Sequence, residues 1–289
     1  MLFGILPPYR AGVAADPAWM VEFAQHAEAV GFESLYTVEH VVVQAGYAAR
    51  YPYAAGGRMP LPDECPIPDP LDLLAFLAGV TERIVLATGI LVLPEHHPVQ
   101  LAKRVATIDV LSGGRMRLGV GVGWMREEIE AVGVDFDTRG VRTDEAIEAL
   151  RALWRDDEAS FEGRFFSFHR AISRPQPVQP GGVPIHVGGH SAAAARRAGR
   201  FGDGFQPLGL DGDALALRMA QLRSAAEEAG RDPEAIELSL GGLLDAVGPD
   251  EVHRAEACGA TRLVLSTREA DLRRLKDQMS AFAQQVIHG

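Results

Sequence analysis

The sequence predicts an α/β fold, a closed (β/α)8 TIM barrel, on two observations. Eight apolar segments have the pattern of strands, and each is followed by a helix signal. Three of these strands also run out into short polar or glycine-rich ends, at residues 38–40, 121–124 and 187–191. The 289 residues suffice for a single domain over 1–289, since such a barrel needs about 250. Because all strand carboxyl ends of a parallel barrel meet at one mouth, the chemistry is expected there.

The expected elements follow from apolar periodicity and turn residues. The first helix should be capped by Asp16 and end at Gly31, and later helices should begin near Pro70, at Pro98 and near Thr143. Right-handed crossovers between successive strands favour closure over an open doubly wound sheet. The eight expected strands cover residues 3–6, 34–38, 84–93, 116–122, 185–187, 205–208, 236–240 and 262–265.

Two insertions interrupt the repeating pattern. A Tyr-, Pro- and Gly-rich stretch, 41–69, follows the second strand, and loops of this length usually form a lid or a binding loop. Its Tyr47, Tyr51 and Tyr53 could line an apolar pocket. A small hairpin around residues 161–166 and an extended linker, 175–184, precede the fifth strand.

Composition excludes several classes of protein. Hydrophobic residues make up 47% and charged residues 23%, which is the balance of an ordinary soluble globular domain. The net charge of −11 repels nucleic acid and anionic lipid, so a small-molecule partner is expected. No apolar run is long enough to span a bilayer and no export signal is visible, which predicts a cytoplasmic protein. Cys65 and Cys258 are expected to be free thiols.

Glycines mark two of the central strands. The third strand is apolar on both faces except at Thr88 and Gly89, and Gly89 indicates a bulge or a close approach of another group. The fourth strand carries Gly119, Gly121 and Gly123 on one face, so something flat or bulky is expected to press there.

Several segments, in the same order, resemble the bacterial luciferase-like monooxygenase family over nearly the whole chain. They are residues 88–94, 102–109, 111–124 and 184–191. Within that superfamily, residues 123–128 and Arg139-Gly140 are similar to a branch of coenzyme F420-dependent oxidoreductases. Lysine occurs only at 103 and 276 while arginine is abundant, a bias typical of GC-rich actinobacterial genomes, in which this deazaflavin is common. The resemblance also implies a homodimer built through early helices, for which the apolar face of helix 98–111 is suited.

The resemblance gives His40 a catalytic role. An imidazole at the end of the second strand could donate or accept the proton that accompanies hydride transfer. Glu39 could orient His40 or face a helix.

The expected cofactor-binding residues come from three strand ends. By the resemblance, Gly89-Ile90 after Thr88 forms a bulge with a non-proline cis peptide behind the central ring of the cofactor. A turn opening a helix, with bare amides and a hydroxyl cap, can hold the phosphate that F420 and FMN both carry. Arg196 and Arg197 are left out of the site. The full set is Thr88, Gly89, Ile90, Gly121, Gly123, Trp124, Gly188, Gly189, His190 and Ser191.

Three other functions stay open. One is an FMN-dependent monooxygenase of the same fold, supplied by a separate reductase. Another is a metal-assisted hydrolase, but Leu6-Pro7-Pro8 stands where a His-x-His pair would end the first strand, and the adjacent histidines of Glu95-His96-His97 point in opposite directions, so metal binding is not expected. The last is a cofactor-binding barrel without catalysis.

Overall fold

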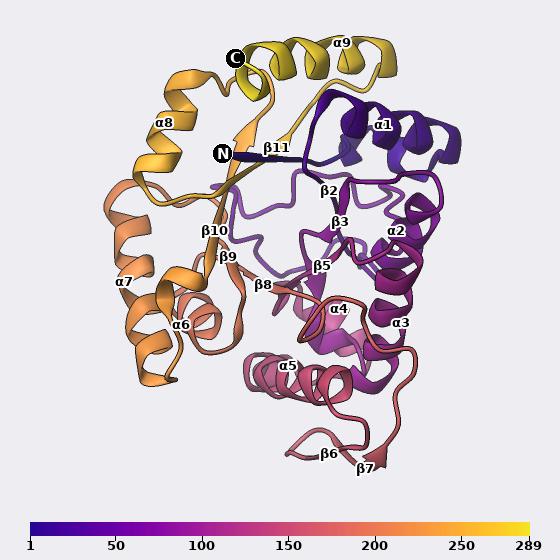
Figure 1. Cartoon of the computed structure of the whole chain (residues 1–289), viewed down its shortest axis with the longest axis vertical. Coiled ribbons are helices and arrows are strands. Elements are labelled where there is room, and N and C mark those ends of the chain that lie inside the picture. The colour runs from indigo at the N-terminus through magenta and orange to yellow at the C-terminus, as the bar shows by residue number, and fades with distance from the viewer.

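The computed structural model describes residues 1–289 and shows a closed, all-parallel barrel surrounded by helices (Figure 1). The strand order is β3-β2-β1-β11-β10-β9-β8-β5-β4, and pairing of β3 with β5 closes the ring. The strands are β1 Leu2–Ile5, β2 Ser34–Thr37, β3 Val85–Thr88, β4 Leu91–Val92, β5 Met116–Gly121, β8 Ile185–Gly188, β9 Gly204–Gln206, β10 Glu237–Leu243 and β11 Arg262–Ser266. The predicted (β/α)8 barrel is therefore confirmed.

The third predicted strand is not continuous. Gly89 and Ile90 separate β3 from β4, and the peptide bond between them is cis. Both pieces still pair with β5, with Leu86 opposite Met116 and Leu91 opposite Val120. The continuous strand over 84–93 was wrong in this detail, and the bulge at Gly89 is confirmed.

The helices follow the strands in the expected alternation. Asp16 caps the first helix through hydrogen bonds from the amides of Ala18 and Trp19, and Gly31 ends it in the left-handed region. The helix expected from Thr143 begins at Arg139, because the 3-10 turn Phe136–Thr138 leads directly into it, and α4 was not anticipated. The helices are α1 Pro17–Val30, α2 Pro70–Ala78, α3 Pro98–Leu111, α4 Arg126–Ala131, α5 Arg139–Arg155, α6 Ala192–Phe201, α7 Gly212–Glu228, α8 Pro249–Ala257 and α9 Leu272–Phe282.

The two insertions lie where they were expected in the chain. Between His40 and α2, residues 41–69 form an irregular loop without helix or strand. The hairpin consists of β6 Ala159–Glu162 and β7 Ser167–Ala171 and packs on α5, where Glu145 accepts hydrogen bonds from three amides of its turn. The linker after it returns to the amino end of the barrel, where Gln179 bonds Asp109 and the carbonyl of Met116.

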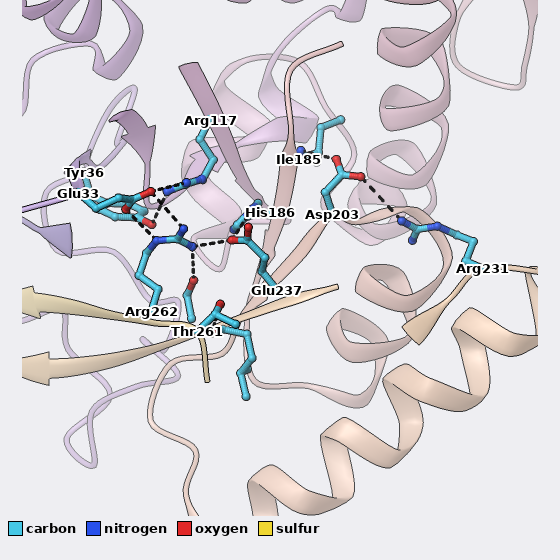
Figure 2. Close-up of polar contacts among 12 residues, drawn as sticks. Glu33, Tyr36, Arg117, Ile185, His186, Asp203, Arg231, Glu237, Thr261 and Arg262 are labelled. Carbon is cyan, nitrogen blue, oxygen red and sulfur yellow. Dashed lines mark hydrogen bonds and ion pairs between the residues drawn. The ribbon is translucent and has the colours of Figure 1, made fainter. Parts of the chain in front are cut away.

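Charged side chains fill the amino end of the barrel interior (Figure 2). Arg262, 1% exposed, bonds Glu33, Glu237 and Ser239, and Arg117 bonds Glu33 from the neighbouring side. Burial alone would raise the pKa of Glu33, but the two guanidinium groups outweigh it and lower that pKa to about 2. TIM barrels usually pack branched apolar side chains here, so this ion network is a particular feature of the chain.

A cavity of about 350 Å³ opens beside this network, next to Arg117 and His186. It lies at the amino end, opposite the polar strand ends, and so belongs to a different face from the expected mouth. None of the helices is long and apolar enough to cross a membrane.

Candidate functional site

His40 lies just beyond β2 and is held by a carboxylate from α4. Its Nδ1 is 2.8 Å from Oε2 of Glu128, whose side chain is 3% exposed. The other oxygen of Glu128 accepts hydrogen bonds from the amides of Val41 and Val42, at 2.6 and 3.3 Å. With Nδ1–H donated to the carboxylate, the ring is fixed in orientation and Nε2 stays free for a proton exchange.

Glu128 was missed from the sequence, although it lies within the 123–128 segment that carries the F420 resemblance. It reaches His40 only because α4, which was not anticipated, follows β5 at the mouth. A glutamate four residues after a strand-end tryptophan gave no local sign of its partner.

Glu39 does not orient His40, contrary to one interpretation of the sequence. Its Oε2 accepts a hydrogen bond from the amide of Val92 at 2.5 Å, and its Oε1 lies 2.9 Å from Nε2 of His96. Glu39 therefore fixes the end of β2 to the segment after the bulge. The rim thus carries two carboxylate–histidine pairs from neighbouring strands.

Glu95 is a third carboxyl group at this rim, and both of its oxygens are buried without a hydrogen-bond partner. Burial, and then the negative charges of Glu128 and Glu39, raise the pKa of Glu95 to about 9. Its carboxyl is therefore neutral at pH 7. The sequence had suggested only a metal ligand at this position.

The Glu95-His96-His97 run is split between three tasks. His96 pairs with Glu39, while Nδ1 of His97 accepts the amide of Val99 and caps α3. No group of three or more His, Cys, Asp or Glu side chains is arranged to hold a metal ion.

The group that presses on the glycine face of β5 is the side chain of Ile90. A Cβ placed on Gly121 would lie 2.7 Å from Cδ1 of Ile90, and one on Gly188 would lie 2.6 Å from its Cγ2. Gly121 and Gly188 thus make room for Ile90, which lets the bulge present the backbone of Gly89 and Ile90 at the mouth.

Two other predicted cofactor residues have packing roles. Thr88 donates its hydroxyl to the carbonyl of Gly119 at 2.7 Å. A Cβ on Gly123 would meet Val92 and Ile129, each at 2.8 Å. Both residues shape the rim from behind.

The turn from β8 to α6 has the features of an anion cradle. Gly189 has φ +117°, a conformation that favours glycine, and a Cβ on it would lie 3.1 Å from Ala194. Ser191 caps α6 by accepting the amide of Ala194, and Arg218 donates to the carbonyl of His190 at 2.9 Å. The first amides of a helix have no intrahelical acceptor, so they can bind a phosphate.

Two unpartnered polar atoms lie near this cradle and the bulge: Nδ1 of His190 and Oε1 of Gln206, both buried. Buried polar atoms are normally satisfied, so such atoms mark a place where a ligand group fits. The bulge, the cradle and these atoms suit a flat heterocycle with a phosphate tail. Gln206 was not identified from the sequence.

An aromatic chain crosses the mouth from His40 to His190. Trp124 packs edge-to-face on His40, with ring centroids 5.9 Å apart, and on Tyr51 at 5.1 Å. Tyr51 contacts Tyr53, which in turn contacts His190 at 4.8 Å. The insertion therefore brings its tyrosines to the mouth, and burial raises the pKa of Tyr53 to about 12.

The arginines of α6 stay outside the site. Arg197 bonds Asp144 and the carbonyl of Gly140, and so ties α6 to α5. Arg196 is exposed and forms no ion pair.

Comparison with known proteins gives a match over almost the whole chain to the family described as luciferase-like monooxygenase, at residues 1–286. An uncharacterised Mycobacterium tuberculosis protein is 34% identical over 259 residues, which are 89% of this chain and 88% of that protein. An F420-dependent glucose-6-phosphate dehydrogenase of Intrasporangium calvum is 29% identical, with 73% of this chain and 59% of the relative covered. An FMNH(2)-dependent dimethylsulfone monooxygenase of Pseudomonas putida is also 29% identical, with 82% and 62% covered.

Solved structures agree on the fold. The monooxygenase RslO1 from Streptomyces bottropensis superposes with a TM-score of 0.78 at 24% identity, covering 100% of this chain and 99% of that one.

Proposed function

Because the chain belongs to the luciferase-like monooxygenase family and is therefore an oxidoreductase, we propose that it transfers a hydride between coenzyme F420 and a small organic substrate. His40 gives or takes the accompanying proton. The observation that carries this proposal is the His40–Glu128 pair, which lies at the barrel mouth with the Gly89–Ile90 bulge.

The site residues divide the work of binding between them. The Gly89–Ile90 backbone would support the ring, and the amides from Gly188 to Ser191 would hold the phosphate. Bound F420 supplies or accepts two electrons as a hydride. Trp124 and the insertion tyrosines exclude water around the reacting atoms.

His40 completes the balance of the reaction. In the reducing direction a substrate double bond gains a hydride on one atom and a proton from Nε2 of His40 on the other; in the oxidising direction both leave. Glu128 keeps Nδ1 bonded, so that only Nε2 faces the exchange. The proton on Nε2 is renewed from solvent after each turnover.

F420 is preferred over FMN because the residues of the F420 resemblance also build the surroundings of His40. Residues 123–128 supply Trp124, which packs on His40, and Glu128, which bonds it. The second candidate is an FMN-dependent monooxygenase with a separate reductase, favoured by the 29% identity to the dimethylsulfone enzyme.

Cofactor choice is the decisive test. Protein purified from a host without F420 is titrated with F420 and with FMN, and the bound fraction is followed by fluorescence. Tighter binding of F420 supports the proposal, whereas a yellow protein that retains FMN through purification favours the monooxygenase.

Substitution of His40 then tests the chemistry. In F420-loaded protein, His40→Ala should lower kcat by about 100-fold or more, the contribution usual for general acid–base catalysis. Glu128→Gln should cost less, about tenfold, and change the pH profile because the ring loses its fixed tautomer. Cofactor affinity should stay within about threefold in both. Unchanged turnover of reduced F420 in His40→Ala would favour another proton donor, and cofactor binding without any hydride transfer would favour a non-catalytic barrel.

We also infer a homodimer. Apolar side chains are exposed on the neighbouring helices α2 and α3, with Phe76 at 43% and Leu111 at 67%. A second copy would remove them from water. Light scattering should then give the mass of two chains, and Leu111→Asp should shift it toward one.

A further inference from the structure

Gln206 ends β9 with a side-chain amide that has no partner in the protein. Its Oε1 is buried and accepts no hydrogen bond. Its Nε2 faces the bulge, 3.5 Å from the place where a Cβ on Gly89 would lie. The donor and the acceptor of this amide are therefore both available at the floor of the mouth.

The backbone fixes Gln206 between the two parts of the candidate site. Its carbonyl accepts the amide of Gly189 at 3.3 Å, and it is registered opposite Gly188 in the β8–β9 ladder. The side chain reaches from this position toward Gly89. Neither end can shift far without breaking the strand pairing next to the phosphate cradle.

An unsatisfied buried amide costs about 1–3 kcal/mol, so such a group is normally matched by a ligand or by ordered water. Glutamine offers a carbonyl beside an amino group, which pairs with an imide, where an N–H stands beside a carbonyl. Among the parts of F420 and FMN, the pyrimidine edge of the ring is such an imide, and both cofactors share it. The hydroxyl groups of the linking chain lack this side-by-side pattern.

We propose that the Gln206 side chain binds the pyrimidine edge of the redox ring, with Oε1 accepting the ring N3–H and Nε2 donating to the adjacent carbonyl. This inference rests on the proposed function, because it takes the ring to lie at the Gly89–Ile90 bulge. Gln206 then fixes how far the ring enters the barrel, and so where its reacting carbon stands relative to His40.

The test is a binding cycle on the full chain. The ligands are F420 or FMN, whichever binds the wild type more tightly, and the same molecule methylated at N3. Gln206→Leu removes both hydrogen bonds, and Gln206→Glu keeps an acceptor but places a charge against the ring carbonyl. Gln100→Leu, on the exposed face of α3, is the matched control.

We expect Gln206→Leu and Gln206→Glu each to weaken binding of the unmethylated cofactor by about tenfold or more, the loss of about one or two hydrogen bonds. N3-methylation should weaken binding to the wild type by a similar factor and have little effect on Gln206→Leu. Gln100→Leu should match the wild type. The second variant separates a lost contact from a general folding defect, which thermal melting would reveal.

Three results would overturn the inference. Equal affinity of the wild type and Gln206→Leu leaves the amide without a role in binding. An equal loss for the methylated and unmethylated ligands assigns the contact to another part of the cofactor. If the wild type binds neither F420 nor FMN, the proposed function fails as well, whereas the first two results leave it standing.

Discussion

Hydrogen bonding distinguishes the three carboxyl groups at the carboxyl rim. Glu39 and Glu128 each pair with a histidine and with backbone amides, while Glu95 has neither. Because like charges in a confined site cannot all ionise cheaply, the unpaired group stays protonated. The rim therefore carries one neutral carboxyl beside two hydrogen-bonded pairs.

Glu95 predicts an unusual pH dependence of stability. Its pKa is raised in the folded protein from 4.5 to about 9, so the folded state binds more protons than the unfolded state between these values. The stability that Glu95 contributes is complete below pH 4.5 and is lost as pH rises toward 9. Glu95→Gln should therefore gain stability over the wild type as pH rises, by about 2 kcal/mol between pH 5 and pH 9. Thermal melting at both pH values measures it.

The exposed Glu64 is the control for this prediction, because Glu64→Gln removes the same charge where no ion pair or hydrogen bond is present. Its melting curve should keep the pH dependence of the wild type. Parallel pH dependence of Glu95→Gln and the wild type would contradict a neutral Glu95.

The bulge between β3 and β4 is the element on which the rest of the site is built. Ile90 fits between two glycines of neighbouring strands, and Glu39 holds the next segment by the amide of Val92. The backbone that would support a ring is thus set by packing behind it. A side chain on either glycine would push the bulge toward the mouth.

Gly121→Ala tests this packing. The added methyl would lie 2.7 Å from Ile90 Cδ1, so overpacking should cost about 1–3 kcal/mol of unfolding free energy. In an Ile90→Ala background the same substitution should cost at least about 1 kcal/mol less, because the contact is gone. Urea unfolding of the four proteins of this cycle measures the coupling.

Gly56→Ala is the matched control, since a Cβ there meets nothing within 4 Å. It should change stability little. A cost of Gly121→Ala that is the same with and without the Ile90 side chain would show that the glycine serves backbone freedom instead.

Local pattern was sufficient for the elements and insufficient for the contacts between them. Caps such as Asp16 and Gly31 act within one turn, so the sequence predicts them directly. The break at Gly89–Ile90 depends on glycines of β5 and β8, far away in the chain, and only the family resemblance indicated it. His40 was found because it ends a strand. Glu128 and Gln206 became visible only when strands from distant parts of the chain met at one mouth.

On the scale of the whole molecule, the two ends of the barrel have different tasks. The carboxyl end carries unpartnered groups at Glu95, His190 and Gln206, whereas the amino end satisfies its buried charges internally. Arg262 and Arg117 share Glu33 between them, which joins β11 and β5 to the start of β2 (Figure 2). Removing one partner of such a network leaves a buried charge uncompensated.

Glu33→Gln should therefore destabilise the fold without altering the mouth. The folded-state pKa of Glu33 is lowered from 4.5 to about 2, so its stabilisation is complete above pH 4.5 and is lost as pH falls toward 2. At pH 7 the variant should be less stable by about 3 kcal/mol, and the gap should close in acid. Urea unfolding at pH 7 and pH 3 measures this, and the affinity for F420 or FMN at pH 7 should remain that of the wild type. A constant gap at both pH values would mean that packing, rather than the charge of Glu33, holds the amino end together.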